Sequence, residues 1–246
     1  ERMLNRAMPK GVKRFVPAGV KQAIRSAQAK PAPERRTEHA VPGTTLSYQG
    51  VCSICGNHGC FTASADERFA ARSFPCPECR STLRFRNEAS AILDEIGRGR
   101  HLSLITALDD PAVAKLSFYN TGVAGPVRAA MRLLPDYVES SYWDDAEPGE
   151  SRDGVLHQDL QSLTFADDRF DVITSSHVLE HVADPARAFA ELFRVLKPGG
   201  RLIFSIPIPW PPPAASVTRA KLVDGEIEHL KEAVYHESPG GAPSLV

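Results

Sequence analysis

Four cysteines, arranged in two pairs, are the residues whose spacing most clearly indicates chemistry. Each pair has the C-x2-C spacing, and twenty residues separate the first pair from the second. Such a pair turns two sulfurs toward one centre, so two pairs supply the four thiolates of a tetrahedral zinc site. Four protein ligands leave no open position on the metal, which would therefore be structural rather than catalytic. The predicted ligands are Cys52, Cys55, Cys76 and Cys79.

Alternatives for this segment stay open. The cysteines could instead form disulfides. Pairing the other four would leave Cys60 without a partner, and the sequence shows no sign of the secretion that disulfides usually accompany. His58 or Cys60 lies close enough to replace one zinc ligand. The neighbouring arginines could bind nucleic acid, form a solvated face or hold a substrate, while the nearby phenylalanines fit a small core of the segment itself. These arginines are Arg68, Arg72, Arg80, Arg84 and Arg86.

The segment from His157 to Pro207 shows the order strand, polar loop, strand, helix and strand. Residues 170–176 and 201–206 are short and rich in apolar and β-branched residues, which predicts two buried strands. Between them, Asp184 is a good N-cap, Pro185 suits the first helical position, and Pro198 with the two glycines after it should end the helix. Apolar residues recur at helical spacing at Val182, Phe189, Leu192, Phe193 and Leu196. Two strands joined in this way are parallel, so the predicted class is α/β, with an open, mainly parallel sheet and helices on both faces.

These residues resemble the class I S-adenosylmethionine-dependent methyltransferases, in particular the type 11 group, over roughly residues 115 to 207. The resemblance implies that Asp159 accepts a hydrogen bond from the adenine amino group and that Leu160 offers its backbone N–H to the ring. It also implies that Ser175 and Ser176 lie under the methionine part. Ligands of open α/β sheets do bind outside the carboxyl ends of the strands. Read singly, Asp159 could be a turn residue and the serines only polar strand ends.

The first half of the resemblance departs from the family. A strand predicted over residues 116–119 leads into an Asn-Thr loop with two glycines, where the family has an acidic residue and three glycines. A second strand, predicted over residues 137–141, ends in a serine where a carboxylate should hold the ribose. A similar Asn-Thr loop after a double CxxC occurs in a subgroup found beside sugar and secondary-metabolite enzymes. The remaining residues expected to bind the cofactor are Asn120, Gly122, Gly125, Glu139 and Ser141.

Two histidines follow the strand predicted over residues 170–176, where a methyl acceptor should arrive. An imidazole can take up a proton near neutral pH, so His177 and His181 are candidate general bases. Methyl transfer depends largely on positioning, however, and needs no dedicated base. His181 is equally suited to a hydrogen bond with a neighbouring loop at the start of the helix.

Composition and charge divide the chain. Its 246 residues have a net charge of −1, but the first 36 carry +8 and the remainder −9. We expect a basic arm and linker at 1–45, a zinc-ribbon-like module at 46–86, a helical connector at 87–114 and a class I methyltransferase domain at 115–246. The arm could be a flexible lead-in or touch acidic lipid. No apolar run reaches the roughly 18 residues of a membrane span, and no signal peptide is visible, so we expect a cytoplasmic protein.

The predicted activity is methyl transfer from S-adenosylmethionine to an O or N atom of a small-molecule acceptor, a sugar or secondary metabolite, beside a structural zinc. The alternative is a nucleic-acid-binding zinc module joined to a methyltransferase-like domain that modifies RNA or is inactive. The 39 residues after Pro207 include proline-rich stretches and one segment, 226–233, that fits a helical turn or two. They do not fit the family's sixth and seventh strands, so we expect the domain to be truncated at its C-terminus.

Overall fold

The computed structural model describes residues 45–64, 74–97, 99–123, 125–208, 214–215, 217–223, 226–232, 235–237 and 243–245. The predicted basic arm and linker, apart from Thr45, therefore lie outside the described residues. Within the described ranges, no helix combines the length and apolar character that a membrane crossing requires.

A six-stranded sheet forms the centre of the fold. In spatial order its strands are β5 (Ser151–Arg152), β6 (Val155–His157), β4 (Tyr137–Ser141), β3 (Phe118–Asn120), β7 (Phe170–Ser176) and β8 (Leu196–Ser205). All neighbouring pairs are parallel except β5 with β6. In chain order, β3 is the first strand of this sheet and lies near its centre. Strands β4, β5 and β6 lie on one side of β3, and β7 and β8 lie on the other. The predicted open α/β sheet is confirmed, and its topological switch point lies between β3 and β7.

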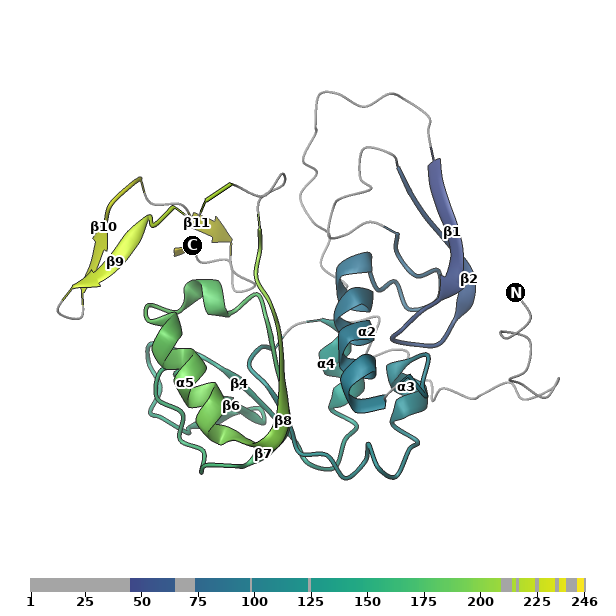
Figure 1. The fold of residues 1–246 in the computed structure, drawn as a ribbon, viewed down its shortest axis with the longest axis horizontal. Helices are drawn as coiled ribbons and strands as arrows, with labels where there is room; N and C mark the ends of the chain where they lie inside the picture. Colours follow the sequence, from purple (N-terminus) through teal and green to yellow (C-terminus); the bar gives the residue numbers. More distant parts are fainter. Residues whose placement is uncertain are drawn as a thin grey trace.

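Helices cover both faces of this sheet (Figure 1). On one side lie α2 (Leu83–Gly97), α3 (Leu104–Ala107) and α4 (Pro126–Met131), and on the other lies α5 (Pro185–Val195), preceded by the 3-10 turn η2 (Leu179–His181). The two faces have separate apolar cores, one against α2, α3 and α4 and one against α5. The helix predicted within the connector is present as α2. It begins inside the part of the chain that contains the cysteines, residues 46–86, which we call the cysteine segment.

The helix α5 begins where predicted and buries the predicted Leu192, but the predicted Phe193 is exposed and the helix ends earlier than predicted. Asp184 caps it by accepting a hydrogen bond from the Arg187 backbone N–H, and Pro185 is its first residue. Its buried residues are Ala188, Leu192 and Val195. Phe193 is 80% exposed, because it lies about 100° around the helix from Leu192. The helix ends at Val195, and Pro198 lies within β8, where the pairing with β7 is irregular, rather than at the helix end.

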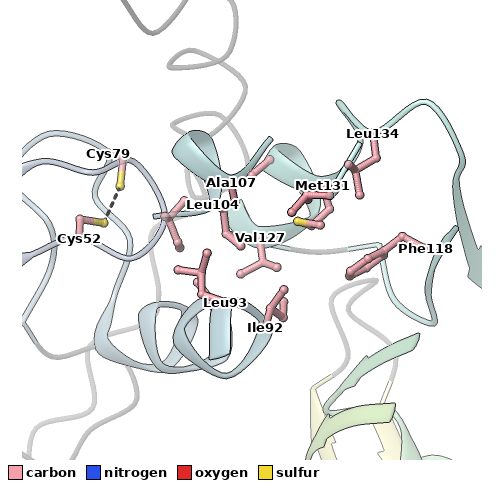
Figure 2. Packing of buried hydrophobic residues seen from close by; sticks show 14 of the residues in the cluster. Cys52, Cys79, Ile92, Leu93, Leu104, Ala107, Phe118, Val127, Met131 and Leu134 are labelled. Atoms are coloured by element: carbon pink, nitrogen blue, oxygen red, sulfur yellow. Dashed lines mark hydrogen bonds between the residues drawn. The ribbon is translucent and has the colours of Figure 1, made fainter. Parts of the chain in front are cut away.

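The cysteine segment packs directly onto the first of these cores. Its strands β1 (Thr45–Val51) and β2 (His58–Ser64) form an antiparallel hairpin beside α2 and α3. One apolar cluster runs from Cys52 and Cys79 through Leu104, Leu93, Ile92 and Val127 to Phe118 of the sheet (Figure 2). The backbone N–H of Leu104 also donates to the Ser53 carbonyl at 2.8 Å. The cysteines are therefore tied to the sheet through α2 and α3.

Past β8, the described residues form two hairpins apart from the main sheet. Strands β9 (Ala220–Val223) and β10 (Glu226–His229) pair antiparallel, as do β11 (Tyr235–Glu237) and β12 (Pro243–Leu245). The helical turns predicted over residues 226–233 are therefore wrong: Glu226–His229 is a strand, because a partner strand satisfies its backbone groups. The predicted C-terminal truncation stays a prediction.

Candidate functional site

The four predicted zinc ligands come together in the fold. Their sulfur atoms all lie within 4.8 Å of one another. The Sγ atoms of Cys52 and Cys79 are 3.7 Å apart, as are those of Cys55 and Cys76. A tetrahedron with Zn–S bonds of about 2.3 Å has edges of about 3.8 Å, so these two separations match a four-thiolate zinc site. All four cysteines are free, so the disulfide alternative is not supported.

Matching backbone turns create this geometry. The N–H of Gly56 donates to the Cys52 carbonyl at 2.8 Å, and the N–H of Arg80 donates to the Cys76 carbonyl at 2.9 Å. Both residues have left-handed backbone, with φ of 76° at Gly56 and 62° at Arg80. The residue after the second cysteine of each pair therefore reverses the chain and turns both sulfurs inward. A glycine accepts this conformation freely, whereas Arg80 carries backbone strain.

The alternative ligands lie outside this cluster. Cys60 is exposed, and neither Cys60 nor His58 is among the four residues whose ligand atoms gather. The arginines are not equivalent either. Arg86 is only 4% exposed, lies 4.0 Å from the centre of the Phe61 ring and donates to the Phe74 carbonyl. Arg86 thus serves as part of the segment's own core, and Arg68 and Arg72 lie outside the described residues.

A second polar cluster occupies the carboxyl ends of β3 and β7, at the switch point of the sheet. The Asn120 side chain donates to the Gly122 carbonyl at 2.7 Å and accepts from the Thr174 hydroxyl at 3.0 Å. The Thr121 hydroxyl donates to Ser175 Oγ at 2.9 Å. Asn120 therefore fixes the start of the glycine loop, as expected of the residue in place of the family's acid, and Ser175 lies buried beside it.

Glu139, in the middle of β4, is held by partners within the protein. Arg128 of α4 donates two hydrogen bonds to its carboxylate, at 2.7 and 2.6 Å, and the Tyr137 hydroxyl donates a third at 3.0 Å. The Glu139 hydrogen bond raises the pKa of the Arg128 guanidinium. Because Glu139 is 2% exposed and Oε2 already has two donors, Oε1 is the oxygen with room for a further donor.

The glycine loop lies against the cysteine segment. Gly125, the N-cap of α4, has a φ of 93°, and a Cβ placed there would lie 2.5 Å from Cε1 of Phe85 in α2. Only a glycine satisfies both the backbone and the close ring. Gly122 is less constrained, since its nearest neighbour to an added Cβ is Val178 at 3.7 Å. The loop conformation therefore depends on the first turn of α2.

Asp159 lies two residues beyond β6, where the adenine is expected. Its carboxylate accepts from the Gln161 backbone N–H at 2.8 Å, and Leu160 beside it is buried in the core under α5. Nearby, the half-buried Trp143 stacks on the buried His157 ring with centroids 6.0 Å apart. Ser141, partly buried, ends β4 and accepts from the Gln158 N–H. The Asp159 carboxylate and the stacked rings of Trp143 and His157 thus both lie at the end of the sheet next to β6.

The two histidines differ in their surroundings. His177 follows β7 with a left-handed φ of 55°, and its Nδ1 lies 3.5 Å from Oε1 of Glu180. The Glu180 side chain is 8% exposed, and among the described residues neither of its oxygens has a hydrogen-bond partner. His181 is exposed and donates its backbone N–H to the Val178 carbonyl. A strained backbone beside a buried carboxylate is typical of functional positions, and it favours His177 over His181.

Several residues of this region were not found from the sequence. Arg128 bonds Glu139 from the following helix, and Thr121 and Thr174 tie the loop to β7. Arg128 could have been noticed, because it lies in the first turn of a helix that opens just after the glycine loop.

Comparisons with known proteins bear on the same part of the chain. Residues 137–204 match a family model described as a methyltransferase domain. A demethylmenaquinone methyltransferase of Clavibacter sepedonicus is 45% identical over 62 residues, 24% of this chain and 25% of the relative. The ubiquinone/menaquinone biosynthesis C-methyltransferase UbiE of Vibrio campbellii is 55% identical over 56 residues, 22% of each chain. Among solved structures, the match to an S-adenosylmethionine-dependent methyltransferase from Mesorhizobium loti covers 53% of this chain and 57% of the other chain, at 21% identity and a TM-score of 0.31.

The strand order is that of an open, mainly parallel α/β sheet, and residues 137–204 within it are similar to a methyltransferase domain. The chain spans about a quarter of the length of the curated relatives it matches. The similarity covers β4 through β8, and β3 with the glycine loop lies outside it.

Proposed function

We propose that the protein binds S-adenosylmethionine and transfers its methyl group to an O or N atom of a small-molecule acceptor. The observation that carries the proposal is that Asn120, Ser175 and Asp159 all lie along the carboxyl edge of the sheet, the first two at its switch point and Asp159 just after β6. These residues come from three separate stretches of sequence, and ligands of open α/β sheets bind at this edge. Two of the three also lie within the residues that match a methyltransferase domain.

The expected roles follow the edge of the sheet. Asp159 would accept from the adenine amino group with Leu160 offering its N–H, and Ser141 with Oε1 of Glu139 would receive the ribose hydroxyls. The loop from Asn120 through Gly122 to Gly125 would lie under the methionine part, with Ser175 below it. S-adenosylmethionine supplies an electrophilic methyl on a sulfonium, and the protein's task is to hold an acceptor in line with it. A sugar or secondary metabolite is the acceptor class that we favour, from the subgroup that the sequence resembles.

We also propose that Cys52, Cys55, Cys76 and Cys79 hold one structural zinc ion. Support comes from sulfur separations of tetrahedral size and from the burial of three of the four cysteines. A closed site of four thiolates has no position for a substrate, so its role is to stabilise the segment that carries α2. The burial of Arg86 in that segment favours this role over nucleic-acid binding.

Calorimetry with S-adenosylhomocysteine on the purified protein tests the cofactor proposal. Wild type should bind one molecule per chain, and Asp159→Ala should weaken binding roughly ten- to a hundred-fold through the loss of a charge-assisted hydrogen bond. Asp167→Ala is the matched control, because that side chain is 72% exposed and pairs with Arg194. Unchanged affinity in a folded Asp159→Ala variant would remove Asp159 from the site, and no binding by wild type would contradict the proposed function.

A further inference from the structure

Glu180 places a buried carboxylate in the 3-10 turn η2, which follows β7 at the carboxyl edge of the sheet. The side chain is 8% exposed, and neither oxygen accepts a hydrogen bond from the described residues. An ionised carboxylate in such surroundings is unfavourable unless a positive charge or hydrogen-bond donors compensate it. Glu180 is therefore placed to stabilise a positive charge that forms close by.

Contacts on two sides hold this turn next to the switch point of the sheet. The backbone N–H of His177 donates to the Ser205 carbonyl at 2.9 Å, which ties the turn to the end of β8. Val178 lies against the glycine loop, since its Cγ2 would be 3.7 Å from a Cβ added at Gly122. In the proposed arrangement this loop lies under the methionine part of the cofactor. The turn therefore borders the place that an acceptor in line with the methyl group must occupy.

His177 is the group beside Glu180 that can acquire a positive charge. Its Nδ1 lies 3.5 Å from Oε1 of Glu180, close enough for an ion pair but longer than a hydrogen bond, and such contacts often tighten only when substrate binds. His177 has a left-handed φ of 55°, and its side chain is 28% exposed, so a constrained backbone holds a ring that still reaches solvent. A proton on Nδ1 would face the carboxylate, which makes Nε2 the nitrogen that can accept a proton.

We propose, building on the proposed function, that Glu180 is a positioning residue that keeps a proton on Nδ1 of His177, and that Nε2 of His177 takes the proton of a hydroxyl or amine acceptor. The acceptor lone pair attacks the methyl carbon, and the C–S bond breaks with its electron pair going to sulfur, which becomes a neutral thioether. The O–H or N–H proton passes to Nε2. The Glu180 carboxylate stabilises the resulting imidazolium until it releases the proton to water. The acceptor class is accordingly a molecule whose hydroxyl or amine loses a proton on methylation.

Nitrogen-15 NMR of the histidine side chains, with His177→Gln to assign the signals, tests the pair without a known acceptor. With S-adenosylhomocysteine bound, neutral His177 should carry its proton on Nδ1, which the chemical shifts of the two ring nitrogens report. Glu180→Gln should abolish this preference and weaken proton binding by His177 about tenfold, because a nearby opposite charge favours the imidazolium. Glu180→Asp, which keeps the charge, should retain part of both effects.

Exchange of the bound ligand tests whether Nε2 faces the methyl group. Sinefungin has an amine-bearing carbon in place of the methyl-bearing sulfonium, so its ammonium group stands where the methyl group would be. S-adenosylhomocysteine has no charge there. Because a like charge disfavours the imidazolium, His177 should bind its proton about threefold more weakly with sinefungin than with S-adenosylhomocysteine. This comparison uses wild type alone, so it applies even if Glu180→Gln does not fold.

Two controls address other titratable groups, His181 in the same turn and Glu88 of α2, whose pKa is raised by burial and lowered in part by a hydrogen bond with Ser176. His181→Gln and Glu88→Gln should each keep the proton on Nδ1 of His177 and change its proton affinity less than Glu180→Gln does.

Four results would overturn the proposal: neutral His177 in wild type with its proton on Nε2, unchanged proton binding in Glu180→Gln, an equal loss in either control, or the same proton binding with both ligands. Should wild type bind neither ligand, the proposed function itself would fail, a result distinct from these four. Thermal melting of each variant checks that it is folded.

Discussion

The cysteine cluster and the cofactor edge of the sheet are built in opposite ways. In the cluster, four ligands from two short turns meet within 4.8 Å, and no other ligand-bearing side chain in the described residues joins them. Along the edge, the residues come from β3, β4, β7 and the loop after β6, and several are held by residues of other elements, as Asn120 is by Thr174 and Glu139 by Arg128. The spacing of residues within a short stretch of sequence can thus specify a metal site, whereas a cofactor site depends on how helices and strands pack together.

Removing one zinc ligand should have the largest effect. Cys76→Ser should release the metal and destabilise the protein by several kcal/mol, on the order of a large part of a structural zinc's contribution. Because the cluster shares a core with α2 and the sheet, hydrogen exchange should rise in α2 and α3 as well as near the cysteines. Metal analysis and thermal melting provide the measurements.

Cys60→Ser is the control for that experiment, since Cys60 is exposed and lies outside the cluster. It should retain zinc and melt like wild type. Full zinc retention in Cys76→Ser would instead mean that Cys60 or His58 completes the metal site.

Breaking the pair that holds Glu139 should have the next largest effect. Arg128→Met would leave a buried carboxylate with one remaining close donor, the Tyr137 hydroxyl, and should cost about 3–5 kcal/mol in the free energy of unfolding. The double variant Arg128→Met with Glu139→Gln should recover much of the loss, because no charge stays buried. Urea denaturation measures both. Arg132→Met, which removes a half-exposed arginine 3.7 Å from the same carboxylate, should change stability little, and equal losses at both arginines would contradict this account.

A substitution at the contact between the two regions should have a smaller effect on stability. Gly125→Ala places a Cβ 2.5 Å from the Phe85 ring on a backbone with positive φ, and should cost about 2–3 kcal/mol. Gly154→Ala separates the cost of the positive φ from the cost of the contact with Phe85. Gly154 has a φ of 79° and nothing within 4 Å of an added Cβ, so the substitution should cost about 1 kcal/mol. Gly125→Ala should also weaken S-adenosylhomocysteine binding. Equal melting temperatures for the two variants would show that Phe85 does not restrict the loop.

The sequence predicted strands better than it predicted faces and partners. Strands β4 and β7 have their predicted bounds, because alternating apolar residues between turns define a strand locally. Phe193 was placed on the buried face of α5 and is exposed, since helical spacing alone does not distinguish neighbouring phases once a small residue such as Ala188 contacts the sheet. Helix α5 ends before Pro198 because β8 already pairs with β7 at Leu196.

The candidate sites divide in the same way. The cysteines were predictable because ligand identity and the distance between pairs lie in one short stretch of sequence. Asn120 was singled out as the substitute for an acidic residue because the predicted strand ends directly before it, and in the structure it is the last residue of β3. Arg128 was not noticed, since its contact with Glu139 arises only when α4 packs against β4.

The shared apolar cluster has a consequence for how the chain is made. Cys52 and Ile54 are synthesised long before Phe118 and Val172, yet all four belong to one cluster. As the chain leaves the ribosome, the cysteine turns and α2 therefore present apolar surface that stays exposed until β3 and β7 have followed. Capture of zinc by the nascent chain would hold these turns in shape during that interval, when exposed apolar segments are most prone to aggregate. The metal would then act first as a folding aid, before the sheet that it supports exists.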